Sequence, residues 1–212
     1  MPSVTFSNNI FMINTNDSTY AFHINTDGRL SHLYYGAPIT QQQAENLIIK
    51  PPLVIFFNHK DIMLPETSIY DGTGIYENTL ELEFADGDRT SDCVYANHEI
   101  TGDKLTITLK DKLYSLYISL NYTVHTENNI IEKSHTVTNK SGAGVFLNRA
   151  FSGSLSLPGA GWHLGTMYGG WAEEMFMSYE KLTEGCKVIE SRTGSTSHFF
   201  NPSFFIDRKS VV

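Results

Sequence analysis

Short β-prone segments separated by polar turns run through most of the chain, and this repeated pattern constrains the fold more than any other feature. Residues 19–24 and 30–35 flank the dipeptide Asp27-Gly28, in which glycine supplies the positive φ angle that a tight hairpin needs. In residues 80–84 apolar side chains alternate with two glutamates, so the acids belong on one face of a strand. We therefore expect antiparallel strands joined by hairpins.

The same pattern continues to the C-terminal third of the chain. Further strands are expected at residues 104–109, 113–124, 130–138 and 145–157. Helical periodicity is limited to residues 41–50, which we expect to form a short helix or a loop that ends before two prolines. Strands do not alternate with long amphipathic helices, which argues against a parallel sheet. The sequence therefore predicts an all-β fold, an antiparallel two-sheet sandwich, with a single domain over residues 1–212.

The composition agrees with β structure and argues against two classes of partner. Apolar residues make up 41% of the chain and charged residues 18%, with 13 Phe and 11 Tyr, and aromatic enrichment is typical of strands. The formal net charge is -8 and the sequence has no Lys/Arg block. Because phosphate backbones and anionic lipid surfaces are bound by clustered cations, we expect no nucleic-acid partner and no membrane partner.

The N-terminus and the cysteines indicate the cellular compartment. The chain opens on Met-Pro-Ser-Val and has no basic segment followed by a long apolar run, so we expect no secretory signal. The two cysteines, Cys93 and Cys186, do not make a disulfide framework and are expected to be reduced thiols. Together these observations predict a cytoplasmic protein.

Catalytic and metal-binding patterns are not recognisable in the sequence. There is no G-x-S-x-G motif, no cationic cluster flanks either cysteine, and the glycines do not open a helix after a strand. His23 and His32 fall on neighbouring strands of the first expected hairpin and could approach each other, but two ligands without a third make a weak metal site. We therefore expect no catalytic residue, no metal and no cofactor.

A more specific signal lies near the C-terminus, where the sequence reads YGGWAEE and then IESRTGSTSHFFNPSFF. The order and spacing of these residues resemble the G-A-W-A-R-E and I-E-S-x-R-G-x-S-S-H-x-x-N-P-F-F segments of the family 36 glycoside hydrolases, the α-galactosidases. Two earlier segments, GRLSHLYYG and LEFADGDRTSD followed by NHEI, also resemble family motifs. We expect the C-terminal matches to form a structural signature, which comprises Gly170, Glu190, Ser191, Gly194, Ser197, His198, Asn201 and Pro202.

The resemblance implies an N-terminal β-supersandwich domain that precedes a (β/α)₈ catalytic barrel. In this family both catalytic carboxyl groups are aspartates of the barrel, which takes about 250 residues. None of them carries over to this chain, which we expect to be part of the N-terminal domain and inactive alone. The parent would be a homo-oligomeric hydrolase that releases terminal α-D-galactosyl residues from melibiose- or raffinose-type sugars with retention. Its missing barrel would bind the sugars, while this domain would support the barrel and make oligomer contacts.

The resemblance also points to three positions that could contact substrate, Tyr76, Trp171 and Glu174. Trp171 and Glu174 belong to the G-A-W-A-R-E-like segment, and buried structural roles stay open for both. Tyr76 keeps the aromatic residue of a family loop, G-x-G-D-F-R-x-P, that approaches the active site of a neighbouring subunit. Here Ile75 and Glu77 replace the Asp and Arg of that loop, which weakens the expectation of a contact.

Two other functions remain open on the sequence. A stand-alone carbohydrate-binding module is suggested by the aromatic residues near the signature, among them Trp162, Tyr168 and Tyr179, because aromatic faces can stack on sugar rings. A sugar epimerase of mutarotase type is suggested by the fold, since related supersandwich folds use a His and Glu pair. No spacing in this sequence selects such a pair.

Overall fold

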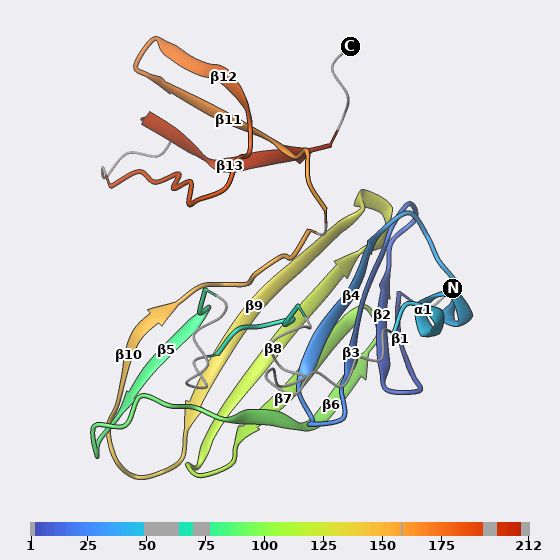
Figure 1. Cartoon of the computed structure of the whole chain (residues 1–212), viewed down its shortest axis with the longest axis vertical. Coiled ribbons are helices and arrows are strands. Elements are labelled where there is room, and N and C mark those ends of the chain that lie inside the picture. Colours follow the sequence, from blue (N-terminus) through green and yellow to red (C-terminus); the bar gives the residue numbers. More distant parts are fainter. Residues whose placement is uncertain (1–2, 49–63, 70–76, 158, 193–198, 209–212) are drawn as a thin grey trace. The chain divides into compact units, whose positions relative to one another are not determined.

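The computed structural model describes residues 3–48, 64–69, 77–157, 159–192 and 199–208 (Figure 1). The chain divides into two compact units, residues 1–157, here called unit 1, and residues 158–212, here called unit 2. The expectation of a single domain over residues 1–212 depends on how these units are placed, and it stays a prediction. None of the helices in the described ranges has the length and apolar character that a bilayer span requires.

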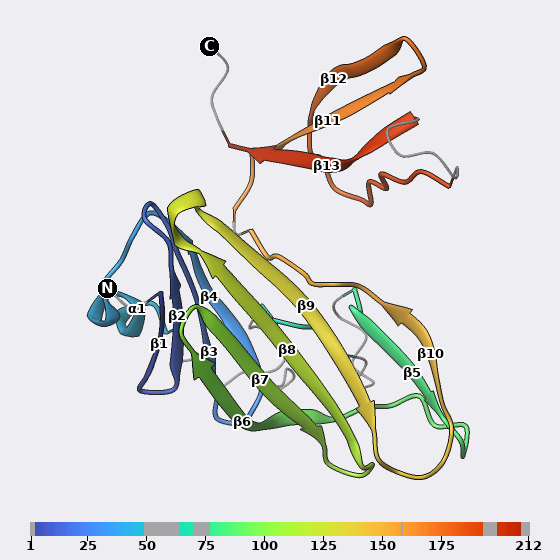
Figure 2. The same cartoon turned by 180° about the vertical axis from the view of Figure 1, so that it is seen from behind.

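Unit 1 is built on two four-stranded antiparallel sheets, which face each other in Figures 1 and 2. The first sheet has the order β1-β2-β3-β4, with β1 (Val4–Ser7), β2 (Ile10–Asn14), β3 (Thr19–Ile24) and β4 (Leu30–Gly36). The second has the order β6-β7-β8-β9, with β6 (Cys93–Thr101), β7 (Lys104–Asp111), β8 (Leu116–His125) and β9 (Ile130–Asn139). A separate two-stranded sheet pairs β5 (Leu80–Phe84) with β10 (Val145–Ala150). The predicted all-β fold class and antiparallel two-sheet sandwich are confirmed.

The apolar core of unit 1 lies between the facing sheets. Every second residue of β8 from Leu116 to Val124 is buried, as expected for a strand with one face on a core. The ring of Phe22 stacks on Phe11 within the first sheet and on Tyr122 across the sandwich, with centroid distances of 5.2 and 5.4 Å. Because a fully buried phenylalanine contributes about 2 kcal/mol, these rings are major ties between the sheets.

A short helix covers the outer face of the first sheet. Helix α1 (Gln41–Asn46) begins after Thr40, whose side chain accepts a hydrogen bond from the Gln43 N–H, while the Gln43 side chain accepts one from the Thr40 N–H. This reciprocal capping box satisfies two backbone donors that a helix start leaves open. Ala44 of the helix packs with Ile10 and Met12 of β2, so β2 is buried on both faces. Of the two possibilities for residues 41–50, a helix is observed over residues 41–46, and residues 49–50 lie outside the described residues.

The two Asp-Gly turns form as predicted, but the second does not make a hairpin of paired strands. Gly28 and Gly87 have φ angles of 83° and 86°, and their N–H groups donate to Asn25 O and Phe84 O at 3.1 and 2.9 Å. After Gly28 the chain returns as β4, which pairs with β3. After Gly87 it returns as β6, which pairs with β7 in the other sheet. The strand expected over residues 145–157 is also shorter, because β10 ends at residue 150.

Unit 2 is a single three-stranded antiparallel sheet. Its order is β12-β11-β13, with β11 (His163–Gly170), β12 (Glu173–Lys181) and β13 (Phe199–Asp207). Among the described residues of unit 2, only Leu164, Gly165 and Thr166 are buried. A lone sheet of this size lacks the second layer that normally encloses a hydrophobic core. Apolar side chains of unit 2 are therefore exposed, whereas unit 1 buries many of its own apolar side chains in its core.

Candidate functional site

Trp171 lies at the tip of the β11–β12 hairpin. Gly170 pairs with Glu173, and the two residues between them form the turn. Ala172 in this turn has a φ angle of 63°, which is unfavourable for a residue with a Cβ atom. Trp171 is 86% exposed. Within the 212-residue chain the hairpin therefore holds a strained turn with an exposed indole ring, and the substrate contact and the buried role of Trp171 both stay predictions.

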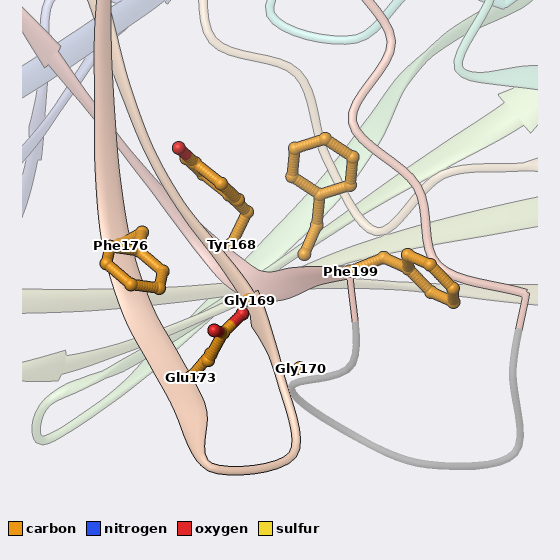
Figure 3. Close-up of a pocket in the computed structure, with 7 residues that line it drawn as sticks. Tyr168, Gly169, Gly170, Glu173, Phe176 and Phe199 are labelled. Carbon is orange, nitrogen blue, oxygen red and sulfur yellow. The ribbon is translucent and has the colours of Figure 1, made fainter.

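A cavity of about 470 Å³ opens beside this turn (Figure 3). Its lining consists of Tyr168, Gly169, Gly170, Glu173, Phe176, Phe199 and Phe200. Figure 3 shows the carboxylate of Glu173 directed toward the backbone of Gly169, with the ring of Phe176 on one side and that of Phe199 on the other. Aromatic walls with one hydrogen-bonding acid suit a small ligand that has both an apolar face and hydroxyl groups. The lining therefore has the chemistry that such a ligand would require.

The cavity does not contain the groups that retaining hydrolysis needs. Such a reaction uses two carboxyl groups about 5–5.5 Å apart, whereas Glu173 is the one acid in the described lining. Glu81 and Glu83 of β5 form ion pairs with Arg149 and Arg89 at 3.1 and 2.7 Å. These ion pairs favour structural roles for Glu81 and Glu83.

The predicted site residues do not all fall in one place. Gly170 lines the cavity, while Trp171 lies in the adjacent turn. Glu174 follows Glu173 in β12, and its side chain lies outside the described part of the structure. Tyr76 lies outside the described residues as well. The structure therefore brings Gly170 and Trp171 together and leaves the contacts of Glu174 and Tyr76 as predictions.

The other signature residues are spread along the segment after β12. Glu190 forms an ion pair with Arg192 at 3.1 Å, and Ser191 lies between them. Asn201, on β13, lines a second cavity of about 520 Å³ together with Leu164 and Phe204. The backbone of Pro202 belongs to β13. Three signature residues fall outside the described ranges, namely Gly194, Ser197 and His198.

Glu173, Phe199 and Phe200 are among the residues of the first cavity that sequence reasoning missed. Glu173 stands where the resembling family motif has an arginine, and this departure was the one available signal that the position was special. Phe199 and Phe200 belong to the S-H-F-F-N-P run, where only the polar residues and the proline attracted attention. Their contribution depends on pairing with Gly169 and Tyr168 of β11, which spacing along the chain does not reveal.

A buried polar cluster in unit 1 was also missed. The carboxylate of Glu66 accepts hydrogen bonds from Tyr122 Oη and Lys133 Nζ, both at 2.7 Å, and from Tyr20 Oη. His32 Nδ1 lies 3.9 Å from Glu66 Oε2, so the fold does create a His and Glu pair. Burial, followed by the adjacent Glu66 charge, raises the pKa of Tyr20 and Tyr122 well above 10.0. Because Glu66 is buried and fully engaged, its contacts favour a structural role over acid–base chemistry on a sugar.

Histidine and cysteine side chains give no further site in the described part of the chain. His23 lies opposite Ser31 and His32 opposite Phe22, so the two histidines point to opposite faces, and the approach that the sequence left possible does not occur. No group of three or more His, Cys, Asp or Glu side chains in the described ranges could hold a metal ion. Burial raises the pKa of Cys93 to about 12, which makes its thiol a poor nucleophile at neutral pH.

These features define an all-β sandwich domain with an aromatic-lined cavity in a separate sheet. The model of the glycosyl hydrolase family 36 N-terminal domain matches residues 28–211, and the chain therefore belongs to this family. The resemblance read from the motifs is confirmed.

Relatives and solved structures agree with this assignment. The α-galactosidase AgaA of Geobacillus stearothermophilus is 25% identical over 230 residues, which cover 95% of this chain and 31% of the relative. The α-galactosidase Mel36A of Lactobacillus acidophilus is 25% identical over 92% of this chain and 30% of its own length. The crystal structure of the Lactobacillus brevis α-galactosidase has a TM-score of 0.83 at 25% identity, covering 94% of this chain and 31% of that one. The chain thus spans about a third of the length of these relatives.

Proposed function

We propose that this chain is the non-catalytic N-terminal part of an α-galactosidase that removes terminal α-D-galactosyl residues from melibiose- or raffinose-type sugars with retention. Family membership supports the proposal. AgaA, which is similar to 95% of this chain, is an α-galactosidase, and its crystal structures include complexes with raffinose and stachyose. The bond-breaking carboxyl groups belong to polypeptide beyond these residues.

The observation that carries the structural role is an exposed apolar face on unit 2. Met167 lies opposite Met177, and Gly165 lies opposite both Tyr179 and Phe205, so all of these residues share one side of the sheet. We call this side the apolar face of unit 2. Met177 is 66% exposed, and Tyr179 and Phe205 are also exposed. Exposed apolar patches of this kind mark protein contacts, and we assign this one to the barrel and to oligomer contacts.

An activity comparison tests the proposal. Hydrolysis of p-nitrophenyl α-galactoside would be measured for the 212-residue chain and for the same chain extended by a family barrel. The proposal predicts turnover by the extended protein and none by the chain alone. Exchanging Met177 for Asp in the extended protein should weaken barrel support and reduce thermal stability, whereas the matched change Leu113→Asp on exposed unit 1 surface should not. Turnover by the pure chain alone would overturn the proposal.

The proposed cellular location is the cytoplasm. It is supported by the unpaired state of both cysteines. Cell fractionation of a tagged natural protein tests it, since recovery in the culture medium or periplasm would contradict a cytoplasmic enzyme.

The cavity beside Trp171 favours a second candidate, a carbohydrate-binding module. Its aromatic rings and single acid suit a sugar ring with one apolar face. Calorimetric titration with galactose and raffinose discriminates between the candidates. A module gives saturable heat that Glu173→Ala abolishes, whereas a scaffold gives no heat above dilution.

A further inference from the structure

Residues 64–69 connect the edge of the first sheet to the two-stranded sheet of unit 1. Residues 64–66 pair with β4 through two backbone hydrogen bonds of 2.7 and 3.0 Å. Ile69 then forms a parallel bridge to Leu80 of β5. This edge segment therefore spans two sheets that do not share a ladder, and side-chain contacts must help to hold it in place.

The carboxylate of Glu66 supplies those contacts. The Glu66 side chain is 1% exposed, and its oxygens accept hydrogen bonds from Tyr20 on β3, Tyr122 on β8 and Lys133 on β9. The ammonium group of Lys133 also lies 5.0 and 5.6 Å from the ring centroids of Tyr20 and Tyr122. One acid therefore ties the edge segment to both facing sheets.

The same ammonium group holds the chain that follows β10. Lys133 Nζ donates to Ser154 O at 2.9 Å, and Ser154 Oγ donates to Glu66 O at 3.1 Å. The N–H of Phe151 donates to Thr79 O at 2.8 Å. Residues 151–157, here called the connector, are thus fastened at two points before unit 2 begins.

We propose that the ion pair between the buried Glu66 and the half-buried Lys133 is a latch that holds the edge segment and the connector on unit 1, so that breaking the pair releases both segments together. The latch fixes the point at which the chain leaves unit 1. This inference does not depend on the proposed enzymatic role, because it concerns contacts within unit 1 alone.

Removing one partner of the ion pair should have a different effect from replacing both partners. Removing one partner leaves an uncompensated charge in a low-dielectric interior, whereas replacing both partners leaves none. Four titratable side chains face the pair, namely Tyr20, His32, Tyr122 and His135. Burial is the largest cause that lowers the pKa of both histidines from 6.5, so neither adds charge at pH 7.5. At this pH a substitution of Glu66 or Lys133 alone should therefore release the two segments, whereas substitution of both residues together should leave the segments held on unit 1.

Amide hydrogen exchange of the 212-residue chain, followed by mass spectrometry at pH 7.5, tests the latch. K133M and E66Q should each speed exchange at least tenfold in the edge segment and in the connector, while peptides from β7 and β8 keep their protection. The double variant E66Q/K133M should exchange within about threefold of the unsubstituted chain. The matched control is K140M, because Lys140 is exposed and stacks on Tyr117 at 5.0 Å.

Two results would overturn the latch. One is connector exchange in K133M as slow as in K140M, and the other is a double variant that exchanges as fast as K133M. If K133M loses protection throughout unit 1, K133Q provides the same comparison, because it keeps a hydrogen-bond donor at this position and removes the charge that pairs with Glu66. Faster exchange confined to the two segments then supports the latch, and unchanged exchange refutes it.

Discussion

Asp111 is a buried acid whose two oxygens organise two stretches of the chain, residues 91–92 and 113–114. Its carboxylate accepts hydrogen bonds from Ser91 Oγ and the Asp92 N–H, both at 2.9 Å, and from the N–H groups of Leu113 and Tyr114 at 2.8 and 2.9 Å. Since a buried donor left without an acceptor costs about 1–3 kcal/mol, we expect Asp111→Ala to lower the free energy of unfolding by about 3 kcal/mol. Urea denaturation measures this loss.

A surface acid provides the control for this prediction. Glu127 is exposed, and Glu127→Ala should change the free energy of unfolding by less than about 0.5 kcal/mol. Equal losses in the two variants would show that the hydrogen bonds to Asp111 do not stabilise unit 1.

Three histidines should make the stability of unit 1 depend on pH. Burial is the largest cause that lowers the pKa of His23, His32 and His135 from 6.5. A folded pKa below the unfolded value means that the unfolded chain binds more protons, so this stability is complete above about pH 6.5 and is lost as the pH falls through that value. We expect the urea concentration at the unfolding midpoint to decrease when the pH is lowered from 7.5 to 5.5. A midpoint that increases when the pH is lowered over this range would contradict the lowered pKa of the three histidines.

At the scale of elements, the Asp-Gly turn after β5 allows backbone strain to be tested without steric crowding as a second cause. Gly87 has a φ angle of 86°, and a Cβ atom added there would meet nothing within 4 Å. Gly144 has equally open space but no positive φ angle. We expect Gly87→Ala to destabilise the chain by about 1–2 kcal/mol, and Gly144→Ala to be neutral or slightly stabilising. Thermal unfolding compares the pair, and equal melting temperatures would remove backbone strain as the reason for glycine at residue 87.

The same elements define what the sequence could predict about the fold. Alternation in β5 and β8 and the two Asp-Gly turns were predictable, because each depends on residues close together in the chain. The placement of β5 and β6 in different sheets was not predictable, because partner choice is decided by contacts far along the chain. The connector was predicted as strand for a similar reason, since the contacts that hold Ser154 come from Glu66 and Lys133.

The site was predictable only where it coincides with a motif. Gly170 and Trp171 were found because their segment has a recognisable order and spacing. Glu66 was not found, because its partners Tyr20, Tyr122 and Lys133 lie 46, 56 and 67 residues away. Because most acidic residues are exposed to solvent, the sequence alone predicts an exposed side chain for a single acid in a β-rich segment.

At the scale of the whole molecule, the two units differ in how they treat apolar surface. Unit 1 encloses a large cluster of apolar side chains between its sheets, whereas the apolar face of unit 2 is exposed. Gly165 shapes that face, because a Cβ atom there would lie 3.4 Å from Phe205 and 3.5 Å from Tyr179. Both distances are ordinary van der Waals contacts, so the two side chains flank Gly165 closely on this face. Such a face should associate with other protein surfaces in water.

We therefore expect the 212-residue chain to self-associate through the apolar face of unit 2. Light scattering coupled to size-exclusion chromatography should give an average mass that rises above 23.8 kDa with concentration. The double variant Met177→Ser/Phe205→Ser should shift this rise to at least tenfold higher concentration, because it removes exposed apolar area without touching the core. Leu113→Ser serves as the matched control, since Leu113 is exposed on unit 1. A mass of 23.8 kDa at every concentration, or an equal shift in both variants, would mean that this face does not drive association and would remove the main support for its role in barrel contact.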